Sequence, residues 1–121
     1  MSNDYIYEIS KIEKLVPLEK VFQFHLINLE KMIKEDGCID KPIIADQQTG
    51  TVLDGSHRYA FLLKNGFLEA PVIWVNYSSE KISTGISLSK EEIINRKGLL
   101  EPRTTRHKFP FQKINIKTSL E

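Results

Sequence analysis

TVLDGSHRYAFLLKNG, residues 51–66, combines two patterns without an intervening loop. Residues 51–54 form a short segment with two apolar residues at its centre, as expected of a strand. From 55 to 65 the apolar residues recur at helical spacing, and Gly66 is a natural end for that helix. The stretch therefore predicts a strand that turns directly into a helix. The positions expected to face the core are Tyr59, Leu62 and Leu63.

Strand-like segments lie on both sides of this stretch. KPIIAD, residues 41–46, predicts a short buried strand, and QQTG, residues 47–50, predicts a turn after it. Residues 51–54 then either pair with the first strand as a hairpin or lie adjacent to it. APVIWVNY, residues 70–77, is a near-continuous apolar run, which favours a strand buried on both faces. Alternating patterns predict one or two strands within 5–17, and an edge strand or a tail over 112–120.

Two further segments have helical patterns. Apolar residues recur at helical spacing over 19–36, and Gly37 gives that helix a natural end. Ser89 and Glu92 have the Ser-x-x-Glu spacing of a capping box, which predicts a helix that stops at Gly98. Together the elements predict an α/β or α+β fold, a small mixed sheet flanked by helices.

Length and composition are those of an ordinary domain. The 121 residues, 40% hydrophobic and 27% charged, suffice for one core. We expect residues 1–121 to form a single domain, with a core at about 10–110 and an edge strand or tail at 111–121. Because no apolar run has the length of a membrane span and the N-terminus lacks an export pattern, we expect a cytoplasmic protein. We expect a monomer or a homodimer. A single cysteine, Cys38, excludes an internal disulfide and a cysteine zinc cluster.

Charge is unevenly distributed along the chain. The net charge of +1 argues against binding to DNA. Residues 61–121, however, contain ten Lys and Arg against six Asp and Glu, and most of the excess lies in 96–117. This pattern indicates either a site for an anionic ligand or a solvated basic surface.

Asp54 to Arg58, the sequence DGSHR, concentrates chemically active groups at the predicted turn. The first turn of a helix leaves N–H groups unpaired and has a partial positive charge, so it attracts anions such as phosphate. Gly55 allows a ligand to approach the backbone closely. Ser56, His57 and Arg58 add a hydroxyl and cationic donors. Asp54 repels a bare phosphate, so its role is to bind Mg²⁺, to accept a proton or to cap the helix.

These segments together resemble the ParB/sulfiredoxin-like superfamily, over about residues 10–110. The closest branch is that of the free serine kinases, in which the turn has the motif Asp-Gly-His-His-Arg. Two other segments support this branch. PLEKV is similar to its N-terminal segment, with Glu19 at the position of the catalytic glutamate, and EPRTTRHKF is similar to the Thr-Arg-His segment that contacts phosphate.

Other branches of the superfamily differ at identifiable positions. Sulfiredoxins have a nucleophilic cysteine where this chain has Ser56, which argues against thiol chemistry. Chromosome-partitioning ParB proteins have a following helix-turn-helix domain, for which we expect no room in 121 residues. The serine kinases have histidine at the position of Ser56, so this chain departs from its closest branch there.

The resemblance implies a kinase that transfers a phosphoryl group from ADP or ATP to the hydroxyl of free L-serine, or a similar amino acid, to give O-phosphoserine. Glu19 is then the general base, Asp54 takes part in Mg²⁺ binding, and His57 belongs to the catalytic group. The residues implied to bind the nucleotide phosphates are Gly55, Ser56, His57, Arg58, Thr104, Thr105, Arg106 and His107.

Two alternatives remain open at this point. One is a ParB-type nucleotide-binding module associated with DNA. The other is a non-catalytic relative that senses a nucleotide. Taken without the resemblance, Glu19 is a favourable residue for a helix start, residues 104–107 suit an exposed loop, and His25 is a structural residue among apolar neighbours.

Overall fold

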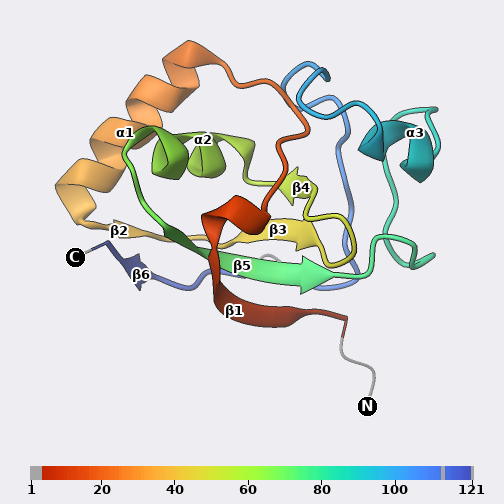
Figure 1. Ribbon diagram of the computed structural model, residues 1–121, viewed down its shortest axis with the longest axis horizontal. Helices are drawn as coiled ribbons and strands as arrows, with labels where there is room; N and C mark the ends of the chain where they lie inside the picture. The colour runs from red at the N-terminus through yellow and green to blue at the C-terminus, as the bar shows by residue number, and fades with distance from the viewer. Residues whose placement is uncertain (1–3, 113, 121) are drawn as a thin grey trace.

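A four-stranded mixed sheet is the central element of the computed structural model, which describes residues 4–112 and 114–120 (Figure 1). The strand order is β1-β5-β3-β4. β3 and β5 are parallel, whereas β1 pairs with β5, and β4 with β3, in antiparallel fashion. The bounds of these strands are β1 Ile6–Lys11, β3 Ile43–Asp46, β4 Val52–Asp54 and β5 Glu69–Val75.

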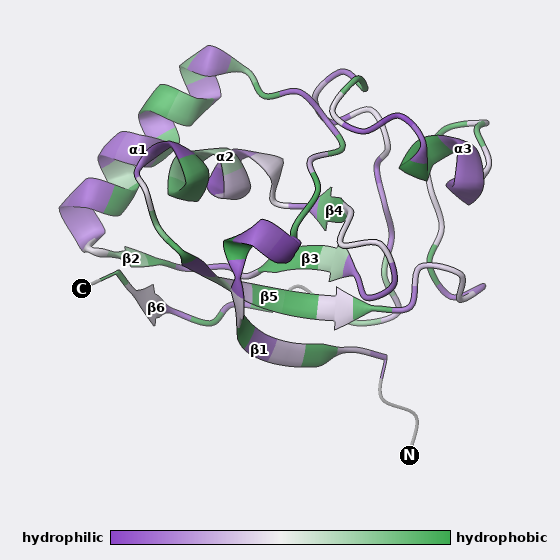
Figure 2. Cartoon of the chain, in the orientation of Figure 1, coloured by the Kyte–Doolittle hydropathy of each residue, from purple (hydrophilic) through white to green (hydrophobic). Residues whose placement is uncertain are grey.

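Two apolar clusters lie on opposite faces of the sheet, and β5 contributes to both. Ala70 and Val72 belong to the cluster beneath the first two helices, while Ile73 and Val75 belong to the cluster that also holds Ile93. Side chains alternate between faces along a strand, so a strand covered on both sides is apolar at every position. The prediction of a strand buried on both faces is therefore confirmed, and Figure 2 shows most of β5 in green.

The helices cover the sheet unequally. α1 (Gln23–Asp36) and α2 (Ser56–Lys64) pack against each other over one face (Figure 1). α3 (Lys90–Ile94) is a short helix at the far end, and its Ser89–Glu92 capping box is present as predicted. A two-stranded ribbon pairs β2 (Cys38–Ile39) with β6 (Thr118–Ser119) beside α1.

The hairpin of β3 and β4 depends on a glycine in its turn. Gly50 has a φ of 78°, and a Cβ placed on it would lie 2.0 Å from the carbonyl oxygen of Lys14. Any larger residue would have to displace that backbone. The hairpin holds β4 so that its last residue, Asp54, leads directly into α2, as residues 51–66 predicted.

Some predicted boundaries were wrong for physical reasons. The first helix begins at Gln23 rather than Glu19, because residues 16–20 run extended and bond to Gly50, Val52 and Leu100 instead. Leu63 is 55% exposed and does not face the core. α3 ends at Ile94, before Gly98, and the second half of 5–17 is a short 3₁₀ turn, Ile12–Lys14, rather than a second strand.

The mixed sheet with helices on it confirms the predicted fold class. The tail at 111–121 includes the two-residue strand β6, and its residues 113 and 121 lie outside the described part of the chain. Among the described residues, none of the helices combines the length and apolar character needed to cross a membrane. The extent of the domain, the cytoplasmic location and the oligomeric state remain predictions.

Candidate active site

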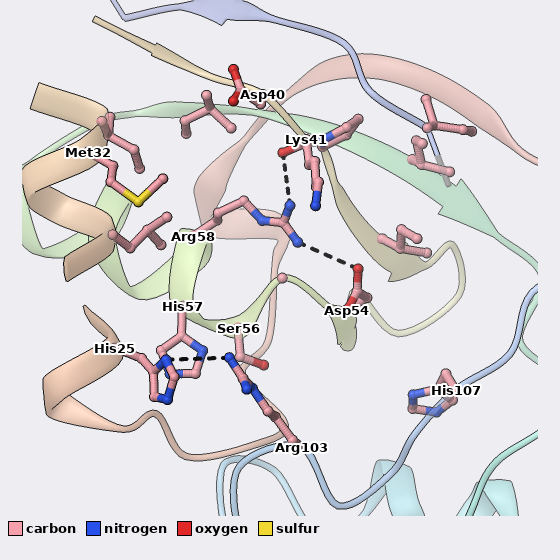
Figure 3. Close-up of a pocket in the computed structure, with 18 of the residues that line it drawn as sticks. His25, Met32, Asp40, Lys41, Asp54, Ser56, His57, Arg58, Arg103 and His107 are labelled. Carbon is pink, nitrogen blue, oxygen red and sulfur yellow. Dashed lines mark hydrogen bonds and ion pairs between the residues drawn. The ribbon is translucent and has the colours of Figure 1, made fainter. Parts of the chain in front are cut away.

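A cavity of about 700 Å³ opens between α1, the start of α2 and the C-terminal segment (Figure 3). One part of its lining is polar and includes Glu19, residues 54–58, Arg103 and His107. The remainder is largely apolar and comes from α1, the 38–44 segment and the residues around Phe109 and Phe111. The part with Glu19 and residues 54–58 is called here the charged end of the cavity, and the charged residues Asp36, Asp40 and Lys41 also line the second part.

The turn at residues 54–58, called here the DGSHR turn, faces the charged end. Gly55 precedes α2 in a left-handed conformation, with a φ of 98°, and a Cβ on it would lie 3.2 Å from the guanidinium of Arg58 and 3.3 Å from the Cα of Ile43. The helix cap makes no side-chain hydrogen bond. Asp54 therefore does not cap α2, and the capping alternative is wrong.

Arg58 is a fixed cation beneath the turn. Its guanidinium donates to the carbonyl of Lys41 at 3.4 Å and to the carboxylate of Asp54 at 3.5 Å (Figure 3), and the side chain is only 16% exposed. Burial lowers the pKa of Arg58, and the charge of Asp54 opposes that change. A guanidinium remains charged despite such a shift, so the turn carries a positive charge at a defined place.

His57 is held by the chain that leads into α1. Its Nε2 accepts a hydrogen bond from the backbone N–H of Phe22 at 3.0 Å, which places the proton of the neutral ring on Nδ1. Burial, and then the charges of Arg103 and His25, lower the pKa of His57. At neutral pH the ring is uncharged, and it faces the cavity as a hydrogen-bonding group rather than as a cation.

Glu19 lines the same cavity as the DGSHR turn and lies in an extended segment that pairs with Leu100. One carboxylate oxygen accepts from the N–H of Arg103 at 3.2 Å, and the other accepts from the N–H and the hydroxyl of Thr105, at 3.0 and 2.7 Å. A carboxylate has about four acceptor positions. These three bonds fix its orientation and leave capacity for one further donor.

The segment 101–107, called here the 101–107 loop, is organised around Glu19. Thr105 is 2% exposed and binds Glu19, whereas the hydroxyl of Thr104 donates to the carbonyl of Glu101 at 2.8 Å. The side-chain stem of Arg106 lies over Gly85. Thr104, Thr105 and Arg106 are absent from the lining of the cavity, although the resemblance implied that they bind phosphate.

His107 lines the cavity but is occupied on both ring nitrogens. Nδ1 donates to the carbonyl of Leu53 at 3.1 Å, and Nε2 accepts from the hydroxyl of Tyr77 at 2.8 Å. Burial lowers the pKa of His107 and, with the charge of Asp46, raises that of Tyr77 to about 12. The neutral histidine fastens the 101–107 loop to β4, and it has no ring N–H left for a ligand.

Sequence reasoning missed two residues at the charged end. His25 was interpreted as structural, but it is exposed on α1 and lines the cavity beside His57, with the ring centroids 5.8 Å apart. Arg103 reaches His25 from the 101–107 loop, with 3.5 Å between Nη2 and Nδ1 (Figure 3). The only sequence signal was their position near the motifs: Arg103 lies three residues before Arg106, and His25 six after Glu19.

A magnesium ion would have one carboxylate at this turn. In the described part of the chain, no group of three or more His, Cys, Asp or Glu side chains could hold a metal ion. The Asp54 side chain is 57% exposed and lines the cavity. Mg²⁺ is commonly bound by one or two carboxylates together with substrate phosphates and water, so a single accessible aspartate fits an ion that arrives with a nucleotide.

Comparisons with known proteins agree with the fold and with the resemblance. No protein-family model matches the chain. An ATP-dependent L-serine kinase of Staphylothermus marinus is 32% identical over 75 residues, 59% of this chain and 30% of the kinase. A ParB-like protein of Sulfolobus acidocaldarius is 33% identical over 82 residues, 68% of this chain and 40% of that protein. The chain thus spans less than half the length of either relative.

A solved free serine kinase in complex with AMP superposes with a TM-score of 0.82, covering 97% of this chain and 92% of that one at 16% identity. This likeness shows that the fold is shared. The resemblance to free serine kinases and ParB-like proteins, inferred from residues 51–66 and their surroundings, is therefore confirmed.

Proposed function

We propose that the chain is a nucleotide-dependent kinase that phosphorylates the hydroxyl of free L-serine or a similar amino acid. One observation carries the proposal: a fixed carboxylate, Glu19, and an anion-binding helix start, the DGSHR turn, face the same cavity. Their combination provides a proton acceptor opposite a phosphate site, which phosphoryl transfer to a hydroxyl requires. The serine kinase relatives are consistent with this assignment.

The geometry suggests which residues bind phosphate and which accepts the proton. The free N–H groups at the start of α2 and the guanidinium of Arg58 would hold the phosphate that is transferred or the one next to it. The serine hydroxyl would bind to the remaining acceptor position of Glu19 and pass its proton there as its oxygen attacks phosphorus. The bond to the nucleotide oxygen breaks, giving O-phosphoserine and the shortened nucleotide.

Asp54 is the residue that would hold Mg²⁺ at this turn. Mg²⁺ held there would supply positive charge that offsets the charge of the nucleotide phosphates. Arg58 keeps the Asp54 carboxylate near the cavity through their 3.5 Å contact. His57, neutral and tethered to Phe22, would present its Nδ1–H to the ligand as a donor.

A direct assay tests the proposal. The purified protein is incubated with L-serine, Mg²⁺ and either ATP or ADP, and O-phosphoserine is detected by ³¹P NMR and mass spectrometry. We expect product with at least one donor, and none when serine is omitted. Absence of product with both donors overturns the kinase proposal. Nucleotide binding without turnover would instead support the sensor alternative.

The ParB-like relative supports a second candidate, a nucleotide-binding module of the ParB type. Calorimetric titration with CTP and with duplex DNA separates it from the kinase. Tight binding of CTP or DNA, with no transfer to serine, would favour this second candidate. The near-neutral charge of the chain is an argument against the DNA part.

A further inference from the structure

The 101–107 loop contains two arginines, and they point to different places. Arg103 lines the cavity, whereas Arg106 is absent from the lining and covers Gly85 with its side-chain stem. A guanidinium in the cavity can form two parallel hydrogen bonds to a phosphate, and one outside cannot. The two residues therefore differ in function although they lie three positions apart.

Two contacts hold Arg103 in place. Its backbone N–H donates to Glu19 at 3.2 Å, and its guanidinium donates to Nδ1 of His25 at 3.5 Å. The residue has a φ of 59°, a conformation that is uncommon for residues other than glycine and is kept only where the surroundings impose it. Neither contact neutralises the guanidinium, because one uses the backbone and the other an imidazole.

The guanidinium lies close to the DGSHR turn. Figure 3 shows the Arg103 side chain extending from its loop toward the first turn of α2, where Ser56 and His57 are drawn, and all three residues line the cavity. The charge of Arg103 is also a cause of the lowered pKa of His57. An anion at the start of α2 would therefore lie near two guanidinium groups, those of Arg58 and Arg103.

We propose that Arg103, oriented by His25, binds the phosphate chain of the nucleotide, and that Arg106 does not take part. This inference rests on the proposed nucleotide-dependent function. Because the same residue contacts Glu19 through its backbone and the phosphates through its side chain, it sets the distance between proton acceptor and phosphate. His25 is a positioning residue, since it acts through Arg103.

The test compares the two arginines in one chain. Binding of ATP, ADP, AMP and adenosine is measured by calorimetry for wild type, Arg103→Ala and Arg106→Ala, with thermal unfolding as the folding control. Arg103→Ala should weaken ATP binding about 10- to 100-fold, as expected for loss of hydrogen bonds to a charged group. The effect should shrink from ATP to AMP and vanish for adenosine, while Arg106→Ala binds ATP within about twofold of wild type.

Two further variants define the roles. Arg103→Lys keeps the charge but not the forked geometry, so it should recover only part of the affinity. His25→Ala should weaken ATP binding less than Arg103→Ala and have no added effect in the double variant, because it acts through the same side chain.

The possible failures are distinguishable. If wild type binds ATP and Arg103→Ala binds it equally well, or if Arg106→Ala loses as much affinity, the inference is overturned and the proposed function stands. If wild type binds none of the nucleotides, both are overturned.

Discussion

The two sides of the cavity are built in different ways. The DGSHR turn follows from its own sequence: a strand ends, a glycine adopts a left-handed conformation and a helix begins within a few residues. The 101–107 loop has no regular structure, and its shape depends on Glu19, which lies more than 80 positions away in the chain. The conformation of the DGSHR turn thus depends on local sequence, whereas that of the 101–107 loop depends on long-range hydrogen bonds.

This difference has a consequence for mutations. A change in the DGSHR turn should act on the backbone at the phosphate site, whereas a change in the 101–107 loop should act through Glu19. If the two sides responded alike to matched substitutions, the distinction would fail.

The largest effect is expected for Glu19→Gln. The amide oxygen of glutamine can still accept both hydrogen bonds from Thr105, whereas its amide nitrogen cannot accept from the N–H of Arg103. The amide is also a very poor proton acceptor, and loss of a general base costs about 100- to 10,000-fold in rate. We expect kcat for O-phosphoserine formation to fall by that amount with the KM for ATP little changed. Glu101→Gln, an exposed carboxylate of the same loop that pairs with Lys20, is the matched control and should retain activity. Equal activity of Glu19→Gln and wild type would remove the base assignment.

Gly55→Ala probes the locally built side. The left-handed conformation disfavours alanine by about 1–2 kcal/mol, and the new Cβ would also lie 3.3 Å from the backbone of Ile43. Chemical denaturation should show a lower free energy of unfolding, and calorimetry weaker ATP binding. Gly37→Ala is the matched control, because Gly37 also has a positive φ, 69°, but no heavy atom lies within 4 Å of the added Cβ. It therefore measures the cost of the left-handed backbone without a close contact. It should cost less stability and leave ATP binding unchanged; equal losses in both variants would show that close approach at Gly55 is unimportant.

Thr105→Val probes the side built by long-range contacts. It removes the hydroxyl that donates to Glu19 at 2.7 Å while keeping the backbone N–H, so we expect a loss of about 1 kcal/mol in stability. Activity should fall through kcat rather than through the KM for ATP, since the residue positions Glu19. Thr104→Val removes a hydroxyl that binds only a carbonyl of its own loop and should change both quantities less. A rise in the KM for ATP in Thr105→Val would point instead to a direct phosphate contact.

The smallest effect is a pH dependence that involves His107. Burial holds its folded-state pKa below the unfolded value of about 6.5, so the unfolded chain binds the proton first as the pH falls. The free energy of unfolding should therefore be retained above about pH 6.5 and decline as the pH falls below that value. His57 shifts in the same direction. His107→Gln should show a shallower decline in thermal melts over this range; an unchanged slope would mean that His107 is not responsible.

Much of the fold and part of the site could be predicted. Residues 51–66 determined a strand, a turn and a helix, because hydrophobic spacing and glycine positions act over a few neighbours. The resemblance assigned Glu19, and in the structure Glu19 lines the same cavity as the turn. The predicted helix start at Glu19 was wrong, because the backbone of residues 16–20 pairs with distant segments instead of forming a helical turn.

The sequence by itself determined the mixed sheet, the buried β5 and the strand-to-helix turn at Gly55, because each depends on short-range periodicity and conformational preference. Only the tertiary structure decided which side chains meet across the cavity. Thr105 turned toward Glu19, Arg106 covered Gly85, and Arg103 and His25 reached the charged end together. The hydrogen bonds of Arg103 with His25 and of Thr105 with Glu19 join residues 78 and 86 positions apart, and no local pattern in the sequence encodes such a pairing.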